Sequence, residues 1–448
     1  MEAGSDFPET RFASLGEDRI AYQVFGEGDI DLLYTSATGD PIDLRWEWPA
    51  YATFLRRLGA QARVIMFDRR GSGSSDSASG ESLPSAERWA DDARVVLDAV
   101  GSERAVLFGS ADGGPAAILF AASHPVRTRA LILAMTAGVV SAEPDSPEAT
   151  AAVDSTATAE FVAQAWGTPA LAEFTMPDAA RDPAFVRWFG RACRLSYSPR
   201  DSGTLIQWET GMDVRGALGS VQVPTLVLHR EGYQAIPLDH AKYLAEHISG
   251  ARLAVLPGRD GYIFTEPAED GVHHIEQFLG GLDGMTESDR ALAAILFTDF
   301  VGSTNHLSAL GDRAWRDLLD SHDVIARTAV EQHGGRLVRT TGDGILATFD
   351  GPGRAIRCAR ALGDALQPLG VEIRAGLHAG EVENRGTGID GIAVHIAARV
   401  VEAAAAGELL VSAAVPMLVA GSGIEFDDRG EHQLKGVPGT WQLFAVQR

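Results

Sequence analysis

Two aspartates in the second half of the chain are the side chains whose type and spacing best suit chemistry. Asp299 ends the apolar run "ILFTDF", and Asp343 lies in the turn-forming stretch "TTGDG". If the two strands are antiparallel neighbours, the carboxylates converge and can hold hard divalent cations against a polyphosphate, as in two-metal phosphoryl chemistry. The backbone amides of the small-residue turn from Val301 to Thr304 could then meet phosphate. Taken alone, an aspartate at a strand end is more often a cap than a ligand.

A second stretch, "VLFGSADGGPAA", has the pattern of a strand, a tight turn and a helix. Gly109 and Gly113 have the spacing of the G-x-S-x-G turn that presents a catalytic serine, but Ala111 holds the nucleophile's position. Alanine has no atom that can attack a carbonyl. The stretch therefore predicts the geometry of a hydrolase without its nucleophile.

The elements that must position these residues fall into two groups. From residue 10 to about 280, apolar strand-like runs such as "ARVIMFD" and "PTLVLHR" alternate with helical stretches. This alternation predicts a mostly parallel sheet with helices on both faces. Residues 139–215 interrupt it with an Ala-rich helical insertion, which would lie above the strand ends as a cap.

Glycines and acidic residues in "FLGGLDGMTESDRAL" break the alternation, so we place a domain boundary near residue 283. The second domain, 284–448, begins with the strand "LAAILFTDF" and continues through alternating helices and strands to a hairpin around "LKGVPGTW". The sequence thus predicts an α/β domain over 1–283, followed by an α+β, ferredoxin-like domain.

The first domain resembles the α/β-hydrolase family over its whole length, through "FDRRGSGSSD", the "GSADGG" turn and "VPTLVLHREG". In that family a serine, an acid and a histidine form the catalytic triad. The matching positions here are Ala111, Tyr233 and Gly261. Three independent losses in correctly spaced motifs predict that the triad is gone.

A displaced nucleophile is the alternative for the first domain. Ser110 or Asp112 would then attack, with His240, His273 or His274 as the base. Rotating the turn by one residue would, however, point the side chain into the strand or helix packing. Without hydrolysis, the domain would retain an apolar pocket for an unknown small ligand, or act as an inert or dimerising scaffold.

The second domain closely resembles the class III nucleotide cyclase catalytic domain, through "ILFTDFVGST", "TTGDG", "GLHAGEV" and "VHIAARV". The resemblance implies that Asp299 and Asp343 bind two Mg²⁺ or Mn²⁺ ions. It also implies a reaction in which the ribose 3′-oxygen attacks the α-phosphorus of the same nucleotide and expels pyrophosphate. Catalysis of this kind depends on positioning and charge neutralisation.

Three further positions carry family roles. Arg399 matches the arginine that stabilises charge at the α-phosphate, and His395 takes the place of a ribose-orienting asparagine. The two are one helical turn apart and project from one face, although a solvated salt-bridge face would have the same spacing. Lys435 matches the lysine that contacts the terminal phosphates, and it is one of only two lysines, with Lys242.

The base-reading positions depart from the adenylyl cyclase pattern. Arg339 stands where a lysine is common, Gly388 where an aspartate is common, and Asp390 lies two residues beyond. ATP is the expected substrate, and GTP remains open because Arg339 could serve either purine. The implied nucleotide-binding residues are Phe300, Val301, Gly302, Ser303, Thr304, Arg339, Gly388, Asp390 and Lys435.

The resemblance also implies a homodimer, because in this family the metal-binding aspartates of one chain face the base-reading residues and the arginine of another. The complete site would then exist only in the dimer, which has two such sites.

Composition limits the other possibilities. A formal net charge of −23 argues against binding to nucleic acids or anionic membranes. No apolar run approaches the roughly 20 residues of a membrane span, and the acidic start is unlike a secretory signal, so we expect a soluble cytoplasmic protein. The two cysteines, Cys193 and Cys358, predict buried thiols and no disulfide framework.

The sequence as a whole predicts a homodimeric cyclase that makes cyclic AMP, joined to a hydrolase-like domain that senses a ligand or assists assembly. Two other functions are also compatible with the sequence. One is an ester or lactone hydrolase with a displaced nucleophile, and the other is a binding protein in which both domains are inactive.

Overall fold

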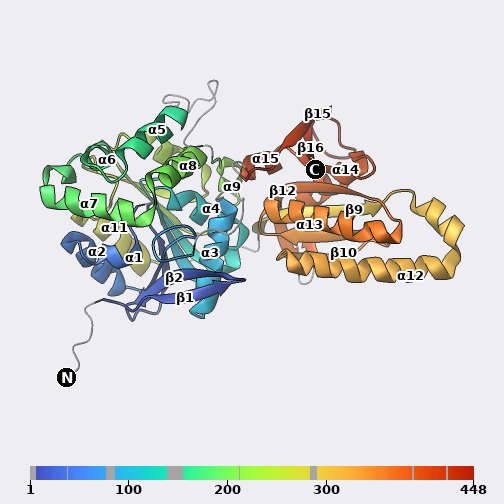
Figure 1. Cartoon of the computed structure of the whole chain (residues 1–448), viewed down its shortest axis with the longest axis horizontal. Helices are drawn as coiled ribbons and strands as arrows, with labels where there is room; N and C mark the ends of the chain where they lie inside the picture. The colour runs from blue at the N-terminus through green and yellow to red at the C-terminus, as the bar shows by residue number, and fades with distance from the viewer. Residues whose placement is uncertain are drawn as a thin grey trace. The chain divides into compact units, whose positions relative to one another are not determined.

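The structure is a computed structural model that describes residues 7–37, 39–76, 86–138, 155–210, 212–282, 290–385, 388–419 and 422–447 (Figure 1). The chain divides into two compact units, Met1–Ser288 and Asp289–Arg448. The boundary predicted near residue 283 falls within 283–289, outside the described residues.

The first unit is built on an eight-stranded sheet with the order β1-β2-β4-β3-β5-β6-β7-β8. Its strands are β1 (Arg11–Leu15), β2 (Asp18–Phe25), β3 (Asp31–Thr35), β4 (Arg63–Phe67), β5 (Ala105–Ser110), β6 (Thr128–Ala134), β7 (Thr225–Arg230) and β8 (Arg252–Leu256). The pairs that join β4, β3, β5, β6, β7 and β8 are parallel, whereas β1, β2 and β4 pair antiparallel. The mostly parallel sheet expected from the alternating pattern is confirmed.

The central strands of this sheet are continuous apolar runs, so both of their faces must be shielded from water. Helices on the two faces of the sheet provide this cover. The helices around the sheet are α1 (Ile42–Arg45), α2 (Pro49–Gly59), α3 (Ala86–Ala99), α4 (Gly113–Ser123), α10 (Leu238–His247) and α11 (Glu269–Gly280), with the 3₁₀ turn η1 (Pro125–Arg127). Residues of α2 and α11 join one core cluster with alternate residues of the strands, such as Val106 and Phe108. In Figure 1, α3 and α4 lie on the other side of the strands from α2 and α11.

Helices between β6 and β7 form the predicted insertion. They are α5 (Ser155–Ala165), α6 (Pro169–Thr175), η3 (Ala179–Arg181), α7 (Pro183–Ser196), α8 (Pro199–Thr210) and α9 (Arg215–Leu218). Residues 139–154 and 211 of the insertion lie outside the described residues. Asp182 caps α7 by accepting a hydrogen bond from the amide of Ala184, and Pro183 occupies the first turn. The apolar face of α7 packs into the main core through Phe185 and Phe189.

The second unit has a mixed sheet with the order β10-β11-β9-β12-β14-β16-β15, and β13 pairs with β12. Its strands are β9 (Arg290–Phe300), β10 (Arg336–Thr340), β11 (Ile345–Phe349), β12 (Ile373–Arg385), β13 (Gly388–Asp390), β14 (Leu409–Ser412), β15 (Phe426–His432) and β16 (Trp441–Val446). Its helices are α12 (Ser303–Gln332), α13 (Pro352–Leu366), α14 (Ile392–Ala403) and α15 (Ala414–Leu418), with the 3₁₀ turn η4 (Gln367–Leu369). The predicted α+β class and the final hairpin, β15 with β16, are confirmed.

The two faces of this second sheet have different partners. Alternate residues of β9, Ile295 and Phe297 among them, pack against α14. Phe300 faces the other way, and its ring meets Trp315 and His322 of α12 edge to face. Since side chains alternate along a strand, Asp299 lies on the same face as α14.

Candidate active site

The two aspartates predicted to bind metal lie at the same end of neighbouring strands. Strands β9 and β11 are antiparallel, with Phe297 opposite Leu346. The amide of Phe300, the residue after Asp299, donates to the carbonyl oxygen of Asp343 at 3.0 Å. The condition set by the sequence, antiparallel neighbouring strands, is therefore met.

The close approach of these strands depends on a glycine. A Cβ atom at Gly344 would lie 1.9 Å from the carbonyl oxygen of Thr298. No side chain fits such a gap, so the "TTGDG" turn requires glycine next to Asp343. The local sequence thus fixes how closely the turn that carries Asp343 approaches the end of β9.

The turn after β9 differs in part from the prediction. The amide of Val301 donates a hydrogen bond to the carbonyl oxygen of Glu372 at 2.9 Å. Because this N–H group already has a partner within the protein, it is not available to a phosphate. Gly302 has a left-handed conformation with φ of 69° and precedes the first residue of α12, Ser303. The amides of the first helical turn, which begins at Ser303 and Thr304, have no partner within a helix and remain suited to an anion.

Arg374 is a residue of the site that the sequence analysis missed. It lies directly opposite Asp299 in the pairing of β12 with β9. Its Nη2 and Nε atoms lie 2.5 Å and 3.0 Å from Oδ2 of Asp299. The signal in the sequence was a lone arginine inside the apolar strand "EIRAGLHAGEV", but its meaning depends on the strand register.

Hard oxygen donors at this end of the sheet suit Mg²⁺ or Mn²⁺. Among the described residues, no group of three or more His, Cys, Asp or Glu side chains could hold a metal ion. Two carboxylates are nevertheless enough for Mg²⁺ when substrate phosphates and water supply the other oxygens. In this structure Arg374 engages Oδ2 of Asp299, so a bound metal ion would have to share that carboxylate with the guanidinium or displace it.

Helix α14 carries the two residues expected to act on the ribose and the α-phosphate. His395 is exposed, whereas Arg399 is partly buried and forms an ion pair with Glu402 one turn further on. This ion pair is the contact that a salt-bridge face would make. No hydrogen bond or ion pair between described residues links Asp299 or Asp343 to His395 or Arg399.

The residues proposed to read the base come from neighbouring segments of one chain. Arg339 is exposed on β10, and Gly388 and Asp390 bound β13, which lies close to β10. Oδ1 of Asp390 accepts a hydrogen bond from the amide of Gly391 at the start of α14. Lys435 is exposed between β15 and β16. The fold therefore groups Arg339 with β13 and leaves Lys435 on a separate loop.

In the first unit, the turn that carries Ala111 has the backbone of a nucleophile elbow. Ala111 has a left-handed φ of 48°, which is uncommon for a residue with a side chain. A Cβ atom at Gly113 would lie 2.5 Å from the carbonyl oxygen of Thr35, and one at Gly114 would lie 2.1 Å from Oγ1 of Thr136. Strand, turn and helix thus pack too closely for side chains at Gly113 and Gly114, and alanine stands at the tip of the turn.

At the other two triad positions, the side chain of Tyr233 occupies the space beside Gly261. A Cβ atom at Gly261 would lie 2.8 Å from the hydroxyl oxygen of Tyr233. Tyr233 is buried, and burial together with the nearby Asp112 carboxylate raises the pKa of its phenol, so it stays protonated. A side chain at the position of the histidine would therefore overlap the ring at the acid's position unless that ring moved.

The loop that would carry the histidine is tied to the cap. Asp260 accepts hydrogen bonds from the amides of Asp178 and Ala179 at 2.8 Å and 3.0 Å. The amide of Gly261 donates to the carbonyl oxygen of Thr175 at 3.0 Å. These hydrogen bonds fix the loop against the cap.

The residues considered as replacements for the triad differ in burial and in the contacts that they make. Ser110 is 1% exposed at the end of β5, and Asp112 forms a 2.5 Å ion pair with Arg69. His273 is exposed on α11 and contacts Gln277 within that helix. His240 lies on α10 and His274 on α11, and both are partly buried.

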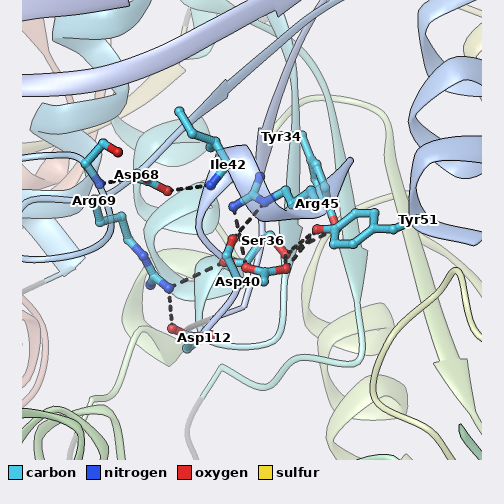
Figure 2. Close-up of polar contacts among 10 residues, drawn as sticks. Tyr34, Ser36, Asp40, Ile42, Arg45, Tyr51, Asp68, Arg69 and Asp112 are labelled. Carbon is cyan, nitrogen blue, oxygen red and sulfur yellow. Dashed lines mark hydrogen bonds and ion pairs between the residues drawn. The ribbon is translucent and has the colours of Figure 1, made fainter. Parts of the chain in front are cut away.

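A buried polar cluster lies beside the elbow (Figure 2). Oδ2 of Asp40 accepts hydrogen bonds from Ser36 at 2.6 Å and Tyr51 at 2.8 Å, and Arg45 donates to the carbonyl oxygen of Asp40 at 2.9 Å. Burial raises the pKa of Asp40, against the opposing effect of Arg45.

Asp68 holds two loops next to this cluster. Its carboxylate accepts hydrogen bonds from the amides of Ile42 at 3.0 Å and Ser74 at 2.9 Å. Burial raises the pKa of Asp68 to about 6. In Figure 2, Arg69 points away from Asp68 and toward Asp112, so the cluster ends at the residue after the elbow alanine.

Comparison with protein families assigns both units. Residues 47–267 match the family described as "Serine aminopeptidase, S33", and residues 286–448 match the "Adenylate and Guanylate cyclase catalytic domain". The chain therefore joins an α/β-hydrolase domain to a class III cyclase catalytic domain.

Each domain of the chain is also similar to individual known proteins. The chain is 29% identical over 157 residues to "Putative adenylate cyclase 3" of Rhizobium meliloti, covering 33% of this chain and 27% of that protein. It is 29% identical over 259 residues to 2-hydroxymuconate semialdehyde hydrolase of Pseudomonas sp. (strain CF600), covering 54% of this chain and 83% of that protein. The chain thus spans only about a quarter of the length of the cyclase relative.

A solved structure agrees with the fold of the first domain. An esterase from Exiguobacterium antarcticum superposes with a TM-score of 0.52 and 20% identity, over 60% of this chain and 99% of that one. Among the described helices, none combines the length and apolar character that a membrane crossing requires.

Proposed function

We propose that the chain is a nucleotide cyclase that converts ATP into 3′,5′-cyclic AMP and pyrophosphate. The observation that carries this proposal is the hydrogen bond from the amide of Phe300 to the carbonyl oxygen of Asp343, which joins the turns of the two candidate metal ligands. The cyclase family match supports the reaction class. Substrate, metal and assembly are the parts that we infer.

The proposed site is shared by two chains. Asp299 and Asp343 of one chain would hold two Mg²⁺ or Mn²⁺ ions, and His395 and Arg399 of the partner subunit would act on the ribose and the α-phosphate. The lack of any direct bond between these two pairs within one chain, among the described residues, agrees with such sharing. A homodimer would then have two equivalent sites.

The reaction needs positioning more than covalent chemistry. The ribose 3′-hydroxyl loses its proton to water, its oxygen forms a bond to the α-phosphorus, and the bond from that phosphorus to the pyrophosphate oxygen breaks. When bound, the divalent cations lower the pKa of the 3′-hydroxyl and neutralise the triphosphate. Arg399 would offset charge at the α-phosphate, His395 would orient the ribose, and Lys435 would reach the terminal phosphates.

We propose ATP rather than GTP as the substrate. Arg339 would donate a hydrogen bond to the adenine base, and Asp390 would accept one in place of the aspartate that is missing at Gly388. Both side chains are exposed, and the strands that carry them, β10 and β13, lie close together, which supports a joint role in binding the base. Because ATP is a cytoplasmic metabolite, the reaction also favours a cytoplasmic location.

We infer that the hydrolase-like domain no longer hydrolyses and acts as a ligand-sensing or regulatory module. Support comes from Ala111 at the elbow, from the ring of Tyr233 in the space beside Gly261, and from the bonds that tie Asp260 to the cap.

Incubation of the full chain with ATP or GTP, each with Mg²⁺ or Mn²⁺, followed by chromatography of the products, tests the proposal. We expect cyclic AMP and pyrophosphate in equal amounts. Nucleotide binding without any cyclic product under Mn²⁺ would instead indicate a binding protein. Hydrolysis of a chromogenic short-chain ester, abolished in Ser110→Ala, would contradict the inference about the first domain.

A further inference from the structure

A cavity of about 570 Å³ opens in the second unit behind the strand that carries Arg374. It lies between the C-terminal half of α13, the segment leading into β12, the turn before β14 and the end of β16. Its volume falls within the range of small-molecule sites. Neither the nucleotide nor the metal ions of the proposed reaction need this space, because Asp299 and α14 lie on the other face of the sheet.

The interior of the cavity is apolar. Ala359, Ile373, Ala375 and Leu409 line it, and all four are buried in the domain. Such a surface favours the hydrocarbon part of a ligand.

The rim of the cavity is acidic. Asp364 and Glu372 are exposed at the rim, and neither carboxylate has a hydrogen-bond or ion-pair partner among the described residues. Glu408 is already neutralised by Arg429 at 2.9 Å. The guanidinium of Arg360 donates to the backbone carbonyl oxygen of Gln447. A carbonyl oxygen does not cancel the positive charge of Arg360, so Asp364 and Glu372 together with this guanidinium leave the rim with one net negative charge, which favours a ligand with a positive charge.

The walls of the cavity are continuous with the candidate metal site. The carbonyl oxygen of Glu372 accepts the hydrogen bond from Val301, in the turn after Asp299. Ile373 and Ala375 flank Arg374, and Arg374 holds Asp299 through the ion pair on the opposite face. A ligand that contacts Glu372 and Ile373 thus touches backbone that also positions Val301 and Arg374.

We propose that this cavity binds a small organic cation, an amine with an apolar body, and that its occupation changes the rate of nucleotide cyclisation. The apolar interior takes the hydrocarbon part, and Asp364 and Glu372 take the ammonium group. The effect on rate rests on the proposed cyclase function, whereas the binding does not. Coupling of this kind requires the ligand to favour one arrangement of the metal-binding end of the sheet over another.

Binding is tested on the full chain with two probes of similar size and opposite charge, phenethylamine and phenylacetate, followed by ligand-observed NMR. We expect phenethylamine to bind at least tenfold more tightly than phenylacetate. Asp364→Asn combined with Glu372→Gln should reduce the affinity for phenethylamine about tenfold. Equal binding of the two probes, or no binding of either, would overturn the proposal.

Filling the cavity provides a second test. Gly363 lines it on α13, and a Cβ atom there meets nothing within 4 Å, so Gly363→Phe should fold normally and abolish binding of phenethylamine. Gly280→Phe, at the end of α11 in the other unit and equally unobstructed, is the matched control that should retain binding. Unchanged binding in Gly363→Phe would refute the site.

The rate of cyclisation is then measured with and without phenethylamine. A change of at least twofold in the wild type, absent in Gly363→Phe, supports the coupling. A rate that does not respond although NMR shows binding would overturn the coupling alone. If the chain forms no cyclic product at all, the proposed function fails while the NMR result still decides the site.

Discussion

The hydroxyl oxygen of Tyr233 lies 2.8 Å from the place that a Cβ atom of residue 261 would occupy. In an α/β-hydrolase triad these two positions would hold the acid and the histidine. Here one large side chain occupies the space of both. The two substitutions are therefore coupled physically, because a side chain at 261 would require the ring of Tyr233 to shift.

This coupling predicts a strongly non-additive response to restoring the triad. Gly261→His alone should cost about 1–3 kcal/mol of stability, because the new side chain overlaps the Tyr233 ring. Adding Tyr233→Asp should recover much of that loss, and the triple variant with Ala111→Ser should gain measurable esterase activity. Thermal unfolding and a chromogenic ester assay provide the measurements. Gly280→His, at an unobstructed helical glycine, is the control, and a Gly261→His variant as stable as this control would contradict the steric argument.

Removal of either candidate metal ligand should abolish cyclisation. Asp299→Asn and Asp343→Asn preserve side-chain shape but remove the negative charge, so we expect turnover to fall about 100-fold or more. The rate of cyclic nucleotide formation under saturating Mn²⁺ is the measurement. Asp29→Asn, an exposed position in the other unit, should leave the rate unchanged. Turnover that survives in both variants would exclude these aspartates as metal ligands.

A shared site predicts complementation between two inactive variants. Asp299→Asn lacks a metal ligand, and Arg399→Ala lacks the residue that we assign to the partner's side of the site. In an equal mixture, about half of the dimers are mixed and each has one intact site, so activity should recover to about a quarter of the wild-type value. The comparison is between the mixture and each variant alone, after subunit exchange. A mixture no more active than its components would show that each site belongs to one chain.

Arg374 should matter more for nucleotide binding than for folding. Its ion pair with Asp299 is about one-third exposed on both sides, and pairs exposed to this degree contribute under about 1 kcal/mol. Arg374→Ala should therefore shift the melting temperature only slightly. Because it removes a positive charge at the edge of the metal and polyphosphate site, KM for the nucleotide should rise about tenfold, with partial rescue by Arg374→Lys. A normal KM together with a large loss of stability would make Arg374 a structural residue only.

The raised pKa of Asp68 should make the stability of the hydrolase-like domain depend on pH. Its pKa is raised by burial from the ordinary 3.8 to about 6, so its contribution to stability is complete below about pH 4 and is lost as the pH rises through 6. Relative to Asp68→Asn, the wild type should lose up to about 1.4 kcal/mol per pH unit within this window. Chemical unfolding followed by tryptophan fluorescence from pH 4.5 to 7 measures the difference. A difference between wild type and variant that does not change with pH would contradict the assignment, and Asp29→Asn should parallel the wild type.

Local patterns were sufficient to predict most of the architecture. The apolar runs of the first domain became parallel strands, the central ones buried on both faces, and the "TTGDG" stretch became the turn between β10 and β11. Both predictions depended on residue type and period, which act over a few neighbouring residues. The buried state of Cys193 and Cys358 was anticipated for the same reason.

Contacts between distant segments were out of reach. The pairing of Arg374 with Asp299 depends on the register of β12 against β9, and the bond from Val301 to Glu372 depends on where the turn after β9 meets the start of β12. A shift of one residue in that register would place Arg374 on the opposite face. No local pattern in either strand specifies this choice.

The sequence by itself determined the two domain families, the loss of the nucleophile at Ala111, and the presence of two aspartates at chemically suitable turns. The tertiary structure decided that Tyr233 occupies the space beside Gly261, that Arg374 neutralises Asp299, and that a cavity with an acidic rim opens behind the same strand. The reason is physical. Residue identity and short-range periodicity are properties of the chain, whereas steric exclusion, ion pairing and cavities arise only when strand register and helix packing bring distant residues together.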